Sequence, residues 1–191
     1  MNSELGSGGP QVHREAEAVI AFWLEETPAE KRFASDDALD TQISERFGAL
    51  RQAVMNDPAP WRVDGRTTLA AIILLDQFSR NIFRGDARAY AGDPLSLDMA
   101  REALDKGWNE GMSSEERQFL YMPFMHSENL EDQKRGVELF ETLGNDEALD
   151  FARRHLAQIE RFGRFPQRNE ALGRETTPEE AELLSDPAQR F

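Results

Sequence analysis

The feature that most constrains the fold is the stretch Leu69 to Gly85, which reads LAAIILLDQFSRNIFRG. Its first seven residues are all apolar, and a helix that is hydrophobic on every side must be buried. From Asp76 onward the pattern becomes two-sided. At about 100° per residue, the polar side carries Asp76, Gln77, Arg80, Asn81 and Arg84. We therefore predict a buried central helix that opens at one end into a polar site.

The rest of the chain is also patterned for helices. Apolar residues recur at three- and four-residue spacing, and no segment alternates with the period of two that a strand requires. Capping boxes at Thr27–Glu30, Ser113–Glu116 and Thr177–Glu180 predict helix starts, while Pro123 is expected to kink or stop its helix. We predict an all-α fold of about eight helices, whose short connections favour antiparallel packing.

Length and composition indicate one folded domain. The Gly- and Ser-containing residues 1–12 are predicted to be a flexible tail, and residues 13–191 a single all-helical domain. The chain lacks cysteine, a secretory signal and any run of about 18 apolar residues. We expect a cytoplasmic protein that does not enter the membrane.

The charge distribution limits the partners. A net charge of −14 argues against nucleic acids and anionic membranes as primary partners. Residues 151–174 nevertheless contain six arginines against two glutamates, a net charge of +4. One local segment is therefore basic although the rest of the chain is acidic. This favours a small anionic ligand or an acidic peptide as partner.

The polar end of the central helix supports two interpretations. Asp76 and Arg80 are four residues apart, so they lie on one helical face and can form an internal ion pair. Alternatively, Arg80 and Arg84 bind an anionic group while Asp76 orients Arg80. Arginine suits this role because its planar fork can hold a carboxylate or phosphate through two hydrogen bonds.

Two histidines are the candidate proton carriers. His155 has apolar neighbours at helical spacing and is either a core residue or a catalytic one. His126 follows Pro123, where a broken helix can direct a side chain into a cavity. His126 with Glu128 has no third ligand at useful spacing, so we predict neither a metal site nor a cofactor. Templates for serine nucleophiles, phosphate loops and dinucleotide sites are absent.

The basic segment ends in a turn-rich region after Gly163. Its polar residues either cap the carboxyl ends of helices or form a surface for an acidic or phosphorylated ligand. The candidate binding residues here are Arg164, Arg168, Asn169 and Arg174.

Three ordered blocks resemble a known family. They are LLDQFSRNIFRG from Leu74, YMPFMHSE from Tyr121 and ERFGRFPQRNEALGR from Glu160. They are similar to the signature blocks of a bacterial family catalogued as domain of unknown function 924. The resemblance implies a right-handed, tetratricopeptide-like superhelical array and no established activity. Gln167 stands where the family usually has histidine, and an amide cannot titrate.

Three hypotheses follow. In the first, the three blocks line one pocket for a small anionic metabolite, with His126 or His155 carrying protons if the protein is an enzyme. In the second, the protein is a non-enzymatic, tetratricopeptide-like module that holds an acidic peptide. In the third, the polar blocks are purely structural. The sequence leaves enzymatic activity and oligomeric state open.

Overall fold

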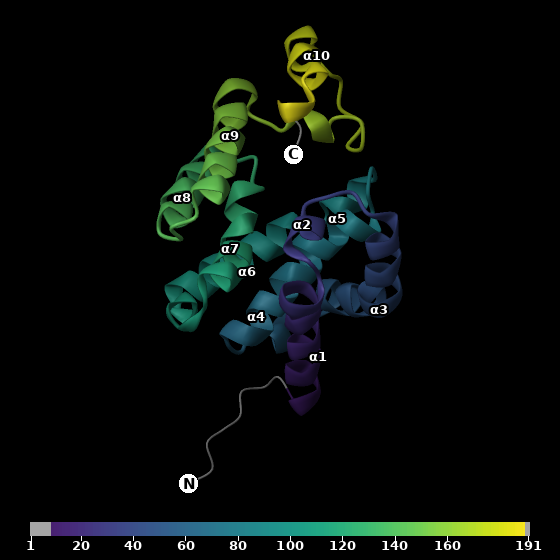
Figure 1. The fold of residues 1–191 in the computed structure, drawn as a ribbon, viewed down its shortest axis with the longest axis vertical. Helices are drawn as coiled ribbons and strands as arrows, with labels where there is room; N and C mark the ends of the chain where they lie inside the picture. The colour runs from purple at the N-terminus through teal and green to yellow at the C-terminus, as the bar shows by residue number, and fades with distance from the viewer. Residues whose placement is uncertain (1–8, 190–191) are drawn as a thin grey trace. The chain divides into compact units, whose positions relative to one another are not determined.

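The computed structural model describes residues 9–189, which contain α-helical, 3-10 and π-helical segments and no β-strand (Figure 1). This confirms the prediction of an all-α fold. When adjoining segments are joined and the short separate 3-10 segments are left aside, the described range contains nine helices, against about eight predicted. The superhelical arrangement stays a prediction.

The helices belong to two compact units. Unit 1 runs to Arg84 and includes Arg88–Pro123, while unit 2 contains Gly85–Ala87 and the residues from Phe124 onward. The helices as far as α7 are α1 (Pro10–Ile20), η1 (Ala21–Glu26), α2 (Ala29–Arg32), α3 (Asp37–Asn56), η2 (Ala59–Trp61), α4 (Gly65–Ile72), η3 (Ile73–Phe78), α5 (Ser79–Ile82), η4 (Ala87–Ala89), α6 (Asp93–Asp105), η5 (Trp108–Gly111) and α7 (Ser114–Met125).

The central helix is the continuous run α4–η3–α5, from Gly65 to Ile82. Asp64 caps its start, because its side chain accepts a hydrogen bond from Thr67 N while Thr67 reaches back to the backbone of Asp64. Every residue from Leu69 to Leu75 has 0% exposure, so the predicted burial is confirmed. The helix packs against α1, α3 and α6.

The polar end of this helix begins with buried side chains, and the prediction that it opens into a polar site stays a prediction. Asp76 is 0% exposed and Gln77 only 7%. Both residues belong to η3, a π-helical turn whose i→i+5 hydrogen bonds rotate the following residues relative to a regular α-helix. Phe78, which the spacing places on the apolar side with Leu74 and Leu75, is 0% exposed, so both sides of the helix are buried at this turn.

The core of unit 1 beside this turn is aromatic. Phe78 lies 5.2 Å from Phe47 on α3 and 5.3 Å from Trp23 on η1, measured between ring centroids. Phe22 completes the group at 5.0 Å from Phe47. Because edge-on and tilted ring contacts hold η1, α3 and η3 together, these side chains fix the position of the central helix.

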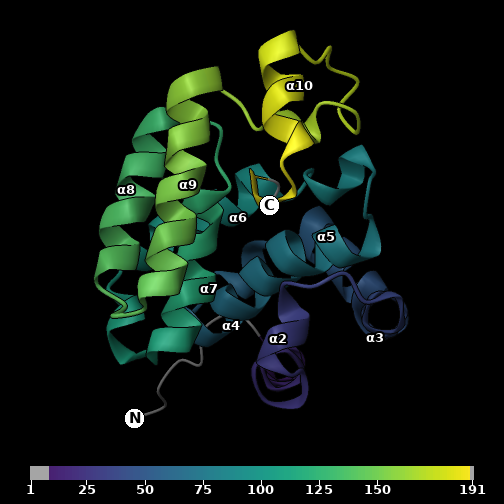
Figure 2. The same ribbon diagram turned by 45° about the horizontal axis from the view of Figure 1, so that its top comes forward.

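Unit 2 is built around a helix pair, α8 (Leu130–Glu141) and α9 (Asp146–Phe162), which pack side by side (Figure 2). Asn129 and Asn145 cap the two helices with their side chains. A Cβ at Gly136 would lie 3.2 Å from Phe124 Cβ, so glycine permits the close approach of α8 to the end of α7. The chain continues through η6 (Pro166–Arg168), α10 (Pro178–Ser185) and η7 (Pro187–Gln189).

The observed helix boundaries can be compared with the predicted capping boxes and the predicted break at Pro123. The capping boxes of Ser113 and Thr177 are confirmed. That of Thr27 is wrong, because its hydroxyl donates to Phe22 O instead. Pro123 lies inside α7, which continues to Met125.

Part of the predicted tail is helical, since α1 begins at Pro10, and residues 1–8 lie outside the described range. Among the described helices, none combines the length and apolar character needed to cross a membrane.

Candidate functional site

Arg80, a predicted ligand residue, lies between two carboxylates of unit 1. Its Nη1 is 3.1 Å from Asp76 Oδ1 and 2.9 Å from Asp93 Oδ1, and its Nη2 donates to Asp93 Oδ2 at 3.0 Å. Gln77 Nε2 donates to the remaining Asp76 oxygen at 2.5 Å. Burial by itself would lower the pKa of Arg80, but Asp76 and Asp93 raise it above its ordinary value. These contacts meet the requirements of a buried ion-pair network.

Arg84 and Asn81 converge on a single acid of α3. Arg84 donates to Asp40 through Nε and Nη2, both at 2.9 Å, and Asn81 Nδ2 donates to Asp40 Oδ1 at 2.7 Å. The hydrogen bond from Arg84 to Asp40 raises the pKa of the guanidinium, although burial opposes it. The pair therefore ties α3 to the carboxyl end of the central helix.

Arg51 on α3 differs from Arg80 and Arg84 in the kind of partner it has, and the sequence analysis did not identify it as a candidate residue. Its side chain is buried, with 4% exposure, and Nε donates to Ser79 Oγ at 2.9 Å. The guanidinium carbon lies 5.2 Å from the centre of the Phe83 ring, and buried Nη2 has no hydrogen-bond partner. Within residues 9–189 no carboxylate pairs with it. Burial lowers the pKa of Arg51, opposite to the shifts of Arg80 and Arg84.

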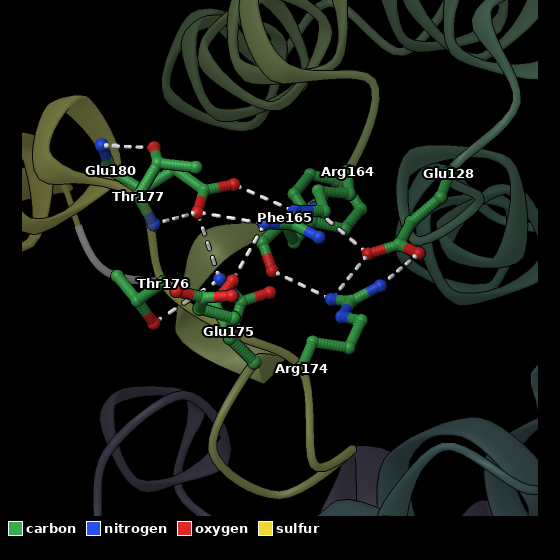
Figure 3. Close-up of polar contacts among 9 residues, drawn as sticks. Glu128, Arg164, Phe165, Arg174, Glu175, Thr176, Thr177 and Glu180 are labelled. Carbon is green, nitrogen blue, oxygen red and sulfur yellow. Dashed lines mark hydrogen bonds and ion pairs between the residues drawn. The ribbon is translucent and has the colours of Figure 1, made fainter.

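In unit 2, Arg174 and Glu128 hold the loop after α9 against the segment before α8. Figure 3 shows the two side chains facing each other, with Arg174 Nη1 2.8 Å from Glu128 Oε2 and Nη2 3.0 Å from Oε1. The backbone N–H of Phe165 donates to Glu128 Oε1 at 2.8 Å. Burial would raise the pKa of Glu128, but Arg174, the Phe165 N–H and the nearby charge of Arg168 lower it.

Arg164 makes a second clamp at the start of α10 (Figure 3). Its Nε and Nη2 donate to the two oxygens of Glu180 at 2.6 and 2.9 Å, and Asn169 Nδ2 donates to Glu180 Oε2 at 3.1 Å. Thr177 N donates to the same oxygen at 2.8 Å. These donors, led by Arg164, lower the pKa of Glu180 to about 2 against the opposing effect of burial. Glu180 is thus ionised and fully engaged at neutral pH.

The two candidate histidines of unit 2 lie near each other. The His126 and His155 ring centroids are 6.0 Å apart, and His155 meets the Phe165 ring edge-on at 5.4 Å. His155 Nδ1 lies 2.8 Å from Phe151 O, and because a carbonyl only accepts, Nδ1 carries the proton. Arg168 stacks on Phe165 and donates to His126 O at 2.9 Å. His155 therefore sits in a packed aromatic and arginine environment with 5% exposure.

The structure brings the predicted residues together in two sets, one in each unit. Unit 1 gathers Asp76, Gln77, Arg80, Asn81 and Arg84; unit 2 gathers His126, Glu128, His155, Arg164, Arg168, Asn169 and Arg174. A single pocket drawn from both sets stays a prediction. The described residues contain no cluster of three acidic or histidine side chains suited to a metal ion.

The profile of the family described as "Bacterial protein of unknown function (DUF924)" matches residues 19–188. The chain belongs to this family. It is similar to the solved structure titled "Structure of Protein of Unknown Function ATU0120 from Agrobacterium tumefaciens", with 40% identity, a TM-score of 0.83 and coverage of 88% of this chain and 96% of the other. No curated protein matches the chain. The family resemblance is confirmed, and the description of the family names no activity.

For this DUF924 chain, one signal could have revealed Arg51. The apolar stripe of α3 runs through Phe47 and Val54, and Arg51 lies four residues after the first and three before the second. A charged residue in a buried stripe needs a partner, so its position alone marks it for attention. The acid partners Asp40, Asp93 and Glu180 had no comparable signal, because acids are common on the exposed helix faces of this chain.

Proposed function

We propose that this protein binds a small anionic ligand at the carboxyl end of the central helix, and that Arg51 receives it. The observation that carries the proposal is the buried guanidinium whose Nη2 has no partner. Buried Arg32 pairs with Glu115 and partly buried Arg80 with Asp93, whereas Arg51 pairs with no carboxylate of the described residues. An anion from solution would supply the missing partner.

The energetics support this assignment. Removing a charged group from water costs several kcal/mol even in a relaxed protein. The hydrogen bond to Ser79 offsets about 1–2 kcal/mol, and the Phe83 ring about 0.5–2 kcal/mol. A bound anion therefore adds a charge-assisted interaction where part of the desolvation cost is not yet offset.

The predicted ligand residues around this site have a supporting role in the proposal. Arg84 and Asn81 bind Asp40 of α3 and so hold Arg51, on the same helix, against Ser79. Asp76 and Arg80 fix the preceding turn through Asp93. That His126 or His155 of unit 2 carries protons stays a prediction.

The test is thermal stabilisation by phosphate, sulfate and acetate at pH 7, with ionic strength held constant by chloride. A ligand that binds the native state raises the midpoint by mass action. We expect at least one anion to stabilise the native protein, and Arg51→Met to lose the effect. The control is Arg46→Met on the same helix, since Arg46 pairs with Glu26 and its guanidinium lies 4.4 Å from the Phe22 ring centre. Equal stabilisation of the Arg51→Met variant would overturn the proposal, as would stabilisation by no anion.

For the predicted arginines of unit 2 we propose the structural alternative. Arg164 and Arg174 each hold both oxygens of one glutamate, so a ligand would have to displace a two-point ion pair. The same contacts tie residues 163–177 to the rest of unit 2. The tetratricopeptide-like peptide-binding module and its acidic peptide stay predictions, for which α8 and α9 supply one packed helix pair.

A further inference from the structure

We infer that a surface cavity of unit 1 binds a dipeptide with free termini and an apolar side chain. The cavity is lined by the end of η1, the start of α2 and the first turns of α3, and its volume is about 300 Å³. This volume is at the lower end of the range for small-molecule sites. The cavity shares no residue with the site proposed at Arg51.

The cavity combines a buried apolar floor with exposed sides. Phe22 and Leu39 line it and are 2% and 7% exposed, so they form its floor. Glu26, Lys31 and Gln42 also line it and are exposed. A ligand can therefore enter from solvent and place an apolar group against the floor while its polar groups stay at the sides.

The turn that forms one wall is held in place before any ligand arrives. The N–H and the hydroxyl of Thr27 both donate to Phe22 O, at 2.9 and 2.7 Å. Buried Arg32 donates to Thr27 O through Nε at 3.2 Å and Nη2 at 2.9 Å. Because this wall is already ordered, binding costs less conformational entropy.

Two opposite charges lie toward opposite ends of the cavity. Lys31 Nζ is 2.8 Å from Asp36 Oδ2 at the start of α3, and Glu26 Oε2 is 3.0 Å from Arg46 Nη1 further along the same helix. Asp36 and Arg46 are separated by about 15 Å along the helix axis at 1.5 Å per residue. The ammonium of Lys31 and the carboxylate of Glu26 are therefore held apart by the length of α3 between their partners.

Both charged groups keep capacity for a ligand. Glu26 uses one oxygen for Arg46, and its Oε1 has no hydrogen bond within residues 9–189. Lys31 uses one of its three N–H groups for Asp36. Their side chains are 53% and 50% exposed, in contrast to Glu180, which is 3% exposed and has both oxygens occupied.

This arrangement selects a zwitterion of a particular length. One carboxylate and one ammonium are complementary to a ligand ammonium and a ligand carboxylate. A dipeptide spans about 7 Å, and a hydrogen bond of about 2.9 Å at each end extends its reach to about 13 Å. Arg46 points back toward the preceding turn, which brings Glu26 within this reach. Gln42 lies between the two ends, where its amide can both donate to and accept from the ligand's peptide group.

The experiment titrates the full chain calorimetrically with alanyl-leucine at pH 7, beside its N-acetyl form, its C-terminal amide and free leucine. We expect the unmodified dipeptide to bind most tightly. Each blocking group removes one charged end and should weaken binding at least tenfold. Leucine, which is too short to reach both ends, should also bind at least tenfold more weakly.

Charge variants test the two ends separately. Glu26→Gln should lower the affinity for the free dipeptide to that for the N-acetyl form, and Lys31→Met should lower it to that for the amide. The controls Glu25→Gln and Lys134→Met remove the same charges from exposed positions outside the cavity lining and should leave the affinity unchanged.

A filling variant tests the cavity itself. Ala38 lines the cavity, so Ala38→Phe should abolish binding. Ala49→Phe adds the same ring at an exposed position of α3 outside the lining and should have no effect.

The outcomes are independent of anion binding at Arg51. Absence of binding by the free dipeptide would overturn the inference and leave the Arg51 proposal untouched. Equal affinities for the free and blocked forms would overturn the two charged ends. Full affinity in both Glu26→Gln and Lys31→Met would overturn the location, whatever the stability of the Ala38→Phe variant.

Discussion

The arginines of unit 2 and Arg51 of unit 1 show two ways in which a protein accommodates a partly buried cation. Arg164 and Arg174 each share both oxygens of one glutamate, and these pairs fasten the loop of residues 163–177. Arg51 is more deeply buried and has a hydroxyl and an aromatic ring instead of an acid. The comparison teaches that arginine content alone does not distinguish the two cases, whereas the partner of each guanidinium does.

The largest effect is expected where a compensated arginine of unit 1 loses an acid. Asp76→Asn leaves the partly buried Arg80 with Asp93 as its remaining carboxylate, and we expect the free energy of unfolding to fall by about 3 kcal/mol. Urea denaturation measures it. The matched control is Asp98→Asn, because Asp98 is 63% exposed in its pair with Arg62 and should matter by less than about 1 kcal/mol. Equal losses in the two variants would contradict a buried network.

A smaller loss is expected from the loop clamp of unit 2. Arg174→Met leaves Glu128 with the Phe165 N–H as a donor and should lower the free energy of unfolding by about 2 kcal/mol. It should also speed proteolysis within residues 163–177. Arg135→Met provides the control, since Arg135 is 55% exposed and pairs with Glu138 within α8. A clamp variant as stable and protease-resistant as this control would argue that Arg174 has a different role.

The pH dependence of unit 2 follows from Glu180. Its pKa is about 2 in the folded chain against an ordinary value of 4.5, so the unfolded chain binds more protons between these values. Stability is therefore fully present above about pH 4.5 and is lost as the pH falls toward 2. Thermal melts from pH 6 to 2.5 should show a shallower decline for Glu180→Gln than for the native chain. Parallel curves would refute the assignment.

The smallest change in stability is expected at Arg51. This prediction tests most directly the difference between arginines paired with an acid and Arg51. Because Arg51→Met replaces an uncompensated buried charge with an apolar chain of similar length, the free energy of unfolding without ligand should change by less than about 1 kcal/mol. Urea denaturation in chloride buffer, beside Asp76→Asn, gives the measurement. A loss as large as that of Asp76→Asn would mean that Arg51 is already stabilised by its present contacts.

Local signals in the sequence predicted most helices. The apolar spacing of α3, the capping box before α10 and Gly163 after α9 each act within a few residues, so their outcome depends little on the rest of the fold. The π-helical turn at Ile73–Phe78 was not predictable from the same spacing, because it depends on how the core packs around it. For the same reason the burial of Asp76 and Gln77 could not be predicted from the spacing.

By itself, the sequence determined that the chain is helical, where its central buried helix runs and that polar groups gather near Arg80 and Arg174. Only the tertiary structure decided what each polar group meets. Arg51 and Ser79 are 28 residues apart, and Glu128 and Arg174 are 46 apart. Such contacts depend on how distant helices pack, whereas periodicity and capping act over one or two turns. The tertiary structure thus decided that Arg164 and Arg174 are matched by an acid and that buried Arg51 is not.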